Sequence, residues 1–298
     1  MDMLTLTHVA KNFGAKQVLR DVSFAVPEHT VFGFVGPNGA GKTTAMKLIL
    51  GLLTISEGEI MVDGMPVRYG NTPTNRVVGY LPDVPEFYSY MTPSEYLRFC
   101  GEISGMPAKE IKSRSEELLR LVGLKDETHR IKGFSRGMKQ RLGVAQALFG
   151  HPKLLICDEP TSALDPAGRK ELLDILTAAK EETTVLFSTH ILSDVEHICD
   201  QMAFLYDGKI ALQGTLDEVR KRRKASAVTV ETEQPEDIEL LRQAFPYLKI
   251  SGKRSLVLEE AERLPEVLYY IADRRLPIMR IERQEATLSD LFMEVVGK

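Results

Sequence analysis

The fold is decided by the segment Val31-Phe-Gly-Phe-Val35-Gly-Pro-Asn-Gly-Ala40-Gly-Lys-Thr-Thr44. Residues 31–35 are an apolar run typical of a buried strand, and the residues from Thr43 to Leu50 predict a helix. Between them, residues 36–44 match the pattern G-x-x-x-x-G-K-[ST], in which glycines let backbone N–H groups turn toward phosphate oxygens. Lys42 can reach the β- and γ-phosphates, and the Thr43 hydroxyl can bind Mg²⁺. The segment predicts a nucleotide phosphate site in an α/β fold.

Two adjacent carboxylates follow a second apolar run, residues 153–157. Asp158 can hold Mg²⁺ through its water shell, and Glu159 can polarise an attacking water or accept its proton. Alone, such a pair is typical of a solvated strand end. In a chain that also carries a phosphate loop, it predicts hydrolysis.

A third motif is Ser135-Arg136-Gly137-Met138, where a helix begins. Ser135 can cap that helix, which leaves N–H groups near Gly137 facing outward. In isolation this is an ordinary helix cap. Together with the two motifs above, it predicts a second phosphate-binding surface.

The rest of the N-terminal part alternates strands and helices, interrupted by a helical block over about residues 93–149. Expected strands lie at 3–9, 22–26, 57–62, 76–81, 183–187, 202–206 and 209–213, and an expected helix lies at 166–180. Asp63-Gly64 and Asp207-Gly208 read as tight turns. This pattern predicts one α/β domain over residues 1–220.

The C-terminal part has a different order of predicted strands and helices. The basic run Arg220–Lys224 reads either as the solvated end of a helix or as a segment attracted to an anionic membrane surface. We expect a linker over 221–226. Residues 227–298 then predict a β-α-β-β-α-β lobe, of ferredoxin-like type, with a short tail helix over 288–295 and no catalytic cluster.

Composition excludes several classes of protein. Among 298 residues, 43% are hydrophobic and the net charge is −4, so no overall basic field points to nucleic acid. Cys100, Cys157 and Cys199 are too few and too scattered for a disulfide framework or a zinc site, which predicts free thiols. No apolar run reaches the roughly 18 residues of a membrane span, and the N-terminus does not read as a signal peptide. We therefore expect any action at a membrane to require a partner.

The order of the motifs resembles that of the ATP-binding-cassette (ABC) ATPases over residues 1 to about 220. It consists of the phosphate loop, the helical block, Phe134–Met138, Asp158-Glu159, Ser162–Asp165 and His190. The resemblance implies a RecA-like core with an antiparallel β subdomain and a helical subdomain. It also implies ATP and Mg²⁺, and a head-to-tail dimer that sandwiches two ATP molecules.

The resemblance implies a role for each matching residue. Glu159 would be the catalytic base, Lys42 would act on the phosphates, and His190 would sense the γ-phosphate. The expected nucleotide-binding residues are Phe13, Gly36, Pro37, Asn38, Gly39, Ala40, Gly41, Lys42, Thr43, Thr44, Ser135, Gly137 and Asp165, and the expected metal-binding residues are Thr43, Asp83 and Asp158. Asp165 would bridge the two subunits, and Phe13 would stack on adenine where the family commonly has tyrosine, with plain core packing as its alternative.

Two positions depart from the family pattern. The usual Leu-Ser-Gly-Gly-Gln reads Phe-Ser-Arg-Gly-Met over Phe134–Met138, and Asp83 stands where glutamine is common. A carboxylate at residue 83 can bind Mg²⁺ but adds negative charge beside ATP, so we expect a tighter dependence on the metal. These departures, the C-terminal lobe and the tail Glu285–Met293 are similar to a branch of bacterial exporters that includes bacitracin-resistance, antimicrobial-peptide and sodium efflux ATPases.

The sequence therefore predicts an ATPase subunit that dimerises on ATP and powers export of a drug, peptide or ion. The expected dimer is a homodimer, with a heterodimer as the alternative. Its partner would be a separate transmembrane permease subunit at the cytoplasmic face of the membrane, and no nucleic acid is expected. Residues 84–91 carry three aromatic side chains, which read equally as core packing or as a docking groove for that partner. Two alternatives are a soluble ABC ATPase that acts on ribosomes or nucleic acid and a regulatory ATP binder without hydrolysis, which the Glu159 carboxylate disfavours.

Overall fold

The computed structural model describes residues 1–70, 72–221, 227–284 and 288–297. These residues form two compact units, Met1–Leu216 and Asp217–Lys298. Apart from Lys221, the linker expected over 221–226 lies outside the described residues, as do residues 285–287 of the tail motif. No described helix is long and apolar enough to cross a membrane.

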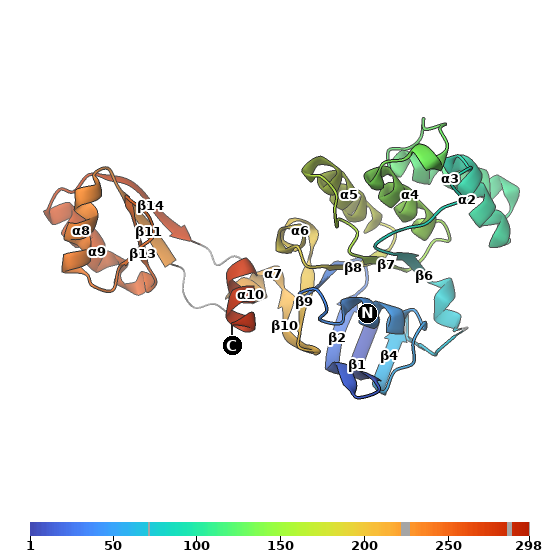
Figure 1. Cartoon of the computed structure of the whole chain (residues 1–298), viewed down its shortest axis with the longest axis horizontal. Helices are drawn as coiled ribbons and strands as arrows, with labels where there is room; N and C mark the ends of the chain where they lie inside the picture. The colour runs from blue at the N-terminus through green and yellow to red at the C-terminus, as the bar shows by residue number, and fades with distance from the viewer. Residues whose placement is uncertain (71, 222–226, 285–287, 298) are drawn as a thin grey trace. The chain divides into compact units, whose positions relative to one another are not determined.

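The first unit is built on a ten-stranded sheet with the order β5-β4-β1-β2-β10-β9-β3-β8-β7-β6. Its strands are β1 Asp2–Phe13, β2 Lys16–Pro27, β3 Val31–Val35, β4 Glu57–Val62, β5 Met65–Pro66, β6 Val78–Leu81, β7 Leu154–Asp158, β8 Thr184–Thr189, β9 Gln201–Tyr206 and β10 Lys209–Thr215. The five neighbours from β9 to β6 run parallel, whereas β1, β2, β4 and β5 pair antiparallel (Figure 1). The expected combination of a parallel core and an antiparallel subdomain is confirmed.

Helices flank this sheet, and most begin at residues suited to a helix start. They are α1 Lys42–Ile49, α2 Pro93–Ile103, α3 Ala108–Leu121, α4 Arg136–Leu148, α5 Pro166–Ala179 and α6 Leu192–Ile198, with short 3-10 turns η1 Pro73–Arg76 and η2 Ile131–Gly133; α7 Leu216–Lys221 spans the boundary between the two units. Thr92 and Glu95 form a reciprocal capping box at the start of α2, with Pro93 in the first turn. The helical block expected over 93–149 is therefore present as α2, α3 and α4.

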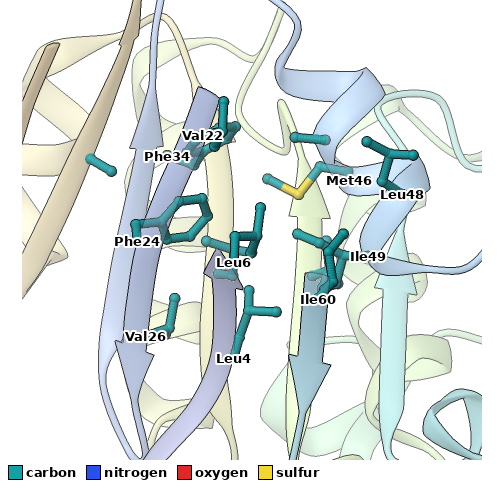
Figure 2. Close-up of a cluster of buried hydrophobic side chains, with 14 of the residues drawn as sticks. Leu4, Leu6, Val22, Phe24, Val26, Phe34, Met46, Leu48, Ile49 and Ile60 are labelled. Carbon is teal, nitrogen blue, oxygen red and sulfur yellow. The ribbon is translucent and has the colours of Figure 1, made fainter. Parts of the chain in front are cut away.

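The core beneath the phosphate loop is formed by alternate residues of the strands and one face of α1. Figure 2 shows the side chains that meet there, namely Leu4, Leu6, Val22, Phe24, Val26, Phe34, Met46, Leu48, Ile49 and Ile60. The ring centroids of Phe24 and Phe34 lie 5.2 Å apart. Since β3 and α1 both contribute, burial of this apolar surface fixes the strand and the helix on either side of the loop.

The second unit carries a four-stranded antiparallel sheet with the order β12-β13-β11-β14. Its elements are β11 Ala227–Thr232, α8 Pro235–Ala244, β12 Lys249–Ile250, β13 Ser255–Leu258, η3 Ala261–Arg263, α9 Leu264–Asp273, β14 Ile278–Gln284 and α10 Leu288–Val296. Buried residues from β11, β13, α8 and α9 form its own core. With the first strand inside the sheet, this β-α-β-β-α-β order is ferredoxin-like, as predicted.

Some expected boundaries were wrong. The strand predicted over 76–81 begins at Val78, because Pro73–Arg76 forms a 3-10 turn instead. The second strand predicted for the C-terminal lobe, over residues 247–251, is only Lys249–Ile250, because the Leu248 N–H bonds back to the Phe245 carbonyl in a turn. In both cases a local hydrogen bond competes with the strand ladder, which apolar patterning does not reveal.

Candidate active site

The loop between β3 and α1 has the tight backbone that its glycines predict. A Cβ atom on Gly36 would lie 2.5 Å from the Leu205 carbonyl oxygen of β9, which is too close for any side chain. Gly41 has a φ of 109°, and its Cβ would lie 2.8 Å from Leu19 Cδ2. Glycine is therefore required at both ends of the loop.

The N-terminus of α1 is open to an anion. Gly41 precedes the helix and supplies no side-chain cap, so the first N–H groups have no side-chain partner there. They border a cavity of about 480 Å³. Its lining residues are Lys16, Gln17, Val18, Asn38, Gly39, Ala40, Gly41, Lys42, Thr43, Thr44, Glu159, Asp207 and Gly208. A helix N-terminus beside a lysine suits a phosphate chain.

Lys42 is the buried cation of this cavity, with only 5% of its side chain exposed. Its ammonium donates hydrogen bonds to the carbonyl oxygens of Gly36 at 2.7 Å and Pro37 at 3.2 Å. It also lies 3.0 Å from Glu159 Oε1. Backbone oxygens and one carboxylate therefore stabilise the lysine charge.

Glu159 joins Lys42 to His190. Its second oxygen, Oε2, lies 2.8 Å from His190 Nδ1. The three residues meet because β3, β8 and β7 are parallel neighbours, so the loops at their carboxyl ends gather at one edge of the sheet. The structure thus brings together the three predicted catalytic residues.

The Glu159 backbone has an unusual conformation, with a φ of 48°. Its N–H donates to both the carbonyl oxygen and the hydroxyl of Ser188, each at 3.1 Å. A side chain in the left-handed region costs about 1–2 kcal/mol. These bonds from β8 hold Glu159 in that conformation in the wall of the cavity.

Asp158 is almost fully buried, and the Ser188 hydroxyl donates to its Oδ1 at 2.6 Å. Among the described residues, no group of three or more histidine, cysteine or acidic side chains could hold a metal. A magnesium ion here would depend on Asp158, the Thr43 hydroxyl and substrate phosphates. That sparse oxygen set is typical of magnesium sites in nucleotide-binding enzymes.

Ser135, Gly137 and Asp165 lie outside the cavity wall. Ser135 caps α4 by accepting from the Met138 N–H at 3.2 Å, and Asp165 caps α5 by accepting from the Gly168 N–H at 2.9 Å. Helix capping accounts for Ser135 and Asp165 within one subunit.

Asp83 also lies outside the phosphate-loop cavity. It borders a separate cavity of about 250 Å³ beside the start of α4. Its Oδ1 accepts a hydrogen bond of 2.6 Å from the Ser162 hydroxyl and lies 3.3 Å from Arg136 Nη2. Its role as a metal ligand stays a prediction.

Phe13 ends β1 and is half-exposed, but it does not line the cavity. The Lys11 ammonium lies 4.9 Å from its ring centroid. Its neighbour across the hairpin, Lys16, does line the cavity. Adenine stacking on Phe13 therefore stays a prediction.

Several residues of the site do not belong to any of the sequence motifs. The cavity lining includes the hairpin residues Lys16, Gln17 and Val18 and the turn Asp207-Gly208. The Ser188 hydroxyl donates to the Asp158 carboxylate and accepts from the Glu159 backbone N–H. The sequence marked Asp207-Gly208 only as a turn. Sheet order brings these segments to the phosphate loop, because β2 and β10 are neighbours.

The fold and the phosphate loop define a nucleotide-binding protein of the P-loop class. A family model described as ABC transporter matches residues 19–162, and one described as ATP-binding protein DrrA1-3-like, C-terminal domain, matches residues 214–296. The chain belongs to the ATP-binding proteins of ABC transporters, with a DrrA-like C-terminal domain.

Individual relatives agree with this assignment. The uncharacterized ABC transporter ATP-binding protein YxlF of Bacillus subtilis is 37% identical over 300 residues, which is 99% of each chain. The bacitracin transport ATP-binding protein BcrA of Bacillus licheniformis is 31% identical over 301 residues, covering 99% of this chain and 97% of that one. A solved ATP-binding subunit of an ABC transporter aligns with a TM-score of 0.65 and 33% identity, over 74% of this chain and 92% of that chain.

The chain is thus an ATPase subunit of an ABC transporter, as the sequence predicted. This confirms the transporter interpretation over the alternatives of a ribosome- or nucleic-acid-directed ATPase and a regulatory ATP binder.

Proposed function

We propose that two copies of this chain bind two ATP·Mg²⁺ between them and hydrolyse ATP to drive a separate membrane permease. The observation that carries this proposal is the contact of Lys42, Glu159 and His190 at the edge of the phosphate-loop cavity. A phosphate-binding lysine, a carboxylate for the attacking water and a histidine for the γ-phosphate are the groups that phosphoryl transfer to water requires.

The ion pair of Lys42 with Glu159 suggests how binding prepares hydrolysis. A γ-phosphate competes with Glu159 for the Lys42 ammonium, because both are anions. When Lys42 turns to phosphate, Glu159 Oε1 becomes available to accept a proton from water. His190 keeps the other oxygen, Oε2, in place. Glu159 then acts as general base, and Lys42 stabilises charge on the phosphate.

Thr43 and Asp158 would hold Mg²⁺, with Asp83 as a further carboxylate ligand. The ion supplies positive charge to the phosphate oxygens. Burial of Asp158 and its bond from Ser188 support a fixed carboxylate at this point.

A second subunit is proposed because the signature residues do not border the cavity of their own chain. Ser135, Gly137 and Asp165 lie beyond its wall and suit contact with ATP held by another copy. Gly137 has open space, since a Cβ there would find its nearest neighbour, Leu164 Cδ2, at 3.9 Å. A homodimer is the simplest arrangement for this chain.

The permease would dock against an aromatic patch, defined as Phe87, Tyr88, Tyr90, Tyr96 and Phe99. Phe87 and Tyr96 meet edge to face at 5.1 Å, which is core packing. Tyr88 packs on Phe99 at 5.4 Å yet remains 49% exposed, and Tyr90 is 62% exposed. Exposed aromatic rings held on a rigid base are suited to anchor a partner.

The cargo is proposed to be a drug, peptide or ion that leaves the cell. The name of the bacitracin transport relative supports a peptide antibiotic within that set. The chain would work at the cytoplasmic face of the membrane, with residues 1–220 as the motor and residues 227–298 as an accessory lobe.

The test is purification of tagged Glu159→Gln protein from its native cells in mild detergent with ATP. Loss of the base should block hydrolysis and trap an ATP-bound dimer together with a multi-span membrane protein. Lys42→Ala is the control, because it should not hold ATP and should not trap the dimer. Rapid hydrolysis by Glu159→Gln, or recovery of ribosomal proteins or nucleic acid without a membrane protein, would refute the proposal.

A further inference from the structure

The two residues that depart from the family pattern contact each other. Arg136 Nη2 lies 3.3 Å from Asp83 Oδ1 and donates to the Ser162 hydroxyl, also at 3.3 Å. The Ser162 hydroxyl in turn donates to Asp83 Oδ1 at 2.6 Å. Asp83 and Ser162 thus contact Arg136, the first residue of α4, although they lie 53 and 26 positions away from it in the sequence.

This cluster leads back to the catalytic base. The Ser162 N–H donates to the Glu159 carbonyl at 3.1 Å. On the other side, buried Gln140 of α4 donates to the Asp83 carbonyl at 2.6 Å. Asp83 therefore joins the start of α4 to the loop that carries Glu159.

The contact between Arg136 and Asp83 is easily broken. Both side chains are nearly half-exposed, at 45% and 49%, and a separation of 3.3 Å is long for a charged hydrogen bond. Exposed pairs of this kind contribute about 0–1 kcal/mol. The guanidinium can therefore leave Asp83 when a stronger anion is presented.

Arg136 stands between Ser135 and Gly137, the residues proposed to contact ATP held by the other subunit. The cavity on that other subunit is lined by two cationic side chains, Lys16 and Lys42, within the described residues. Transfer of a phosphoryl group is commonly accelerated by an arginine that a neighbouring protein supplies.

We propose that Arg136 is a phosphate-binding cation for the ATP on the opposite subunit, and that Asp83 is a positioning residue that holds its guanidinium until that ATP arrives. This inference rests on the proposed dimer. It gives a common purpose to two substitutions in the family pattern, since each supplies one charge of the pair.

The decisive measurement is ATP-driven dimerisation in the Glu159→Gln background, followed by light scattering against ATP concentration. Arg136→Gln should raise the ATP concentration at half-dimerisation about tenfold or more, because it removes the contact across the interface. In saturating Mg²⁺, which removes any effect of Asp83 on the metal site, Asp83→Asn should lower that concentration, because it releases Arg136. Arg98→Gln, which removes an exposed arginine paired with Glu102 on α2, is the matched control and should change nothing.

Opposite shifts identify the proposed roles. If the pair were merely structural, both variants would shift dimerisation in the same direction. Such a result, or no shift with Arg136→Gln, would overturn the inference while leaving the dimer intact. If Glu159→Gln alone does not dimerise with ATP, the proposed dimer fails instead, and the two failures are distinguishable.

A mixing experiment tests whether Arg136 acts across the interface. At an ATP concentration well below the midpoint of Arg136→Gln, the Lys42→Ala and Arg136→Gln proteins are each expected to show little activity alone. Mixed dimers contain one site with an intact phosphate loop facing an intact Arg136, so hydrolysis should exceed the sum of the separate proteins. Lys42→Ala mixed with Glu159→Gln is the control and should show no gain, because Glu159 acts within the subunit that binds the ATP. A gain in the control mixture but none with Arg136→Gln would contradict the proposal.

Discussion

The Lys42 ammonium lies 3.0 Å from Glu159 Oε1, so the phosphate-binding lysine and the proposed catalytic base neutralise each other. Both side chains are largely buried, at 5% and 14% exposure. Breaking a buried pair is costly unless another partner replaces the one lost. In the proposed mechanism, ATP supplies that partner for Lys42, which couples nucleotide binding to release of the base.

Glu159→Gln should therefore tighten ATP binding as well as block hydrolysis. The neutral side chain no longer competes with phosphate for Lys42, so we expect a Kd several-fold lower. Loss of a general base should reduce kcat by about 10²- to 10⁴-fold. Fluorescence titration with a non-hydrolysable ATP analogue measures the Kd, with Glu171→Gln on α5 as the control. An equal Kd for wild type and Glu159→Gln would show that the ion pair does not oppose binding.

Ser188→Ala should weaken the metal site. The Ser188 hydroxyl donates to Asp158 at 2.6 Å and is fully buried, so alanine removes a hydrogen bond that orients the carboxylate. We expect the Mg²⁺ concentration at half-maximal ATPase activity to rise several-fold, and the free energy of unfolding to fall by about 1–2 kcal/mol. Ser115→Ala on α3 also removes a buried hydroxyl, which bonds to the Ile111 carbonyl, and should leave the Mg²⁺ midpoint unchanged. A shift in both variants would argue against a specific role for Ser188.

Local sequence patterns predicted the elements that carry the chemistry. The strands β3 and β4 have the predicted ends, because each is a short apolar or alternating run bounded by glycine or a turn. The motifs also identified Lys42, Glu159 and His190 as site residues, and the structure adds their contacts through Glu159.

What the sequence could not predict depends on the order of strands in the sheet. The hairpin residue Lys16 and the turn at Asp207 reach the cavity because β2 lies beside β10, a pairing that no local pattern encodes. The pairing of Arg136 with Asp83 was likewise invisible, although each residue had been noted as a departure from the family pattern. Both contacts depend on packing between segments that are far apart in the sequence.

Asp83→Gln should make the ATPase less dependent on magnesium. In the proposed metal role the Asp83 carboxylate approaches bound ATP and adds negative charge that the metal must offset, and glutamine removes that charge. We expect a lower Mg²⁺ midpoint in a magnesium titration of ATPase activity. Glu86→Gln, which neutralises an exposed carboxylate three residues further along the same loop, is the control. An unchanged midpoint for Asp83→Gln would end the proposed metal role.

Replacing Tyr88 and Tyr90 by serine should weaken binding of the permease. Both rings are exposed and Tyr88 is held against Phe99, so their removal takes away anchors whose loss commonly costs 2 kcal/mol or more. ATP hydrolysis by the isolated chain should persist. Co-purification with the membrane subunit in mild detergent is the measurement, and Tyr269→Ser, at an exposed tyrosine of α9, is the control. Equal recovery of the membrane subunit with both variants would place the docking surface elsewhere.

Alkaline pH should destabilise the chain through its buried thiols. Burial raises the pKa of the Cys157 and Cys199 thiols above the ordinary 9.0, so they keep their protons in the folded state when the unfolded chain would lose them. The stability that the protonated thiols contribute is fully present below pH 9 and declines as the pH rises above 9. The free energy of unfolding should therefore fall by about 2–3 kcal/mol between pH 8 and pH 10. Burial also raises the pKa of Tyr80 to about 12, which extends the decline above pH 10. Urea unfolding at the two pH values measures the change in the free energy of unfolding. Replacement of both cysteines by alanine should remove most of that change. An equal loss of stability in the alanine variant would exclude the thiols as its cause.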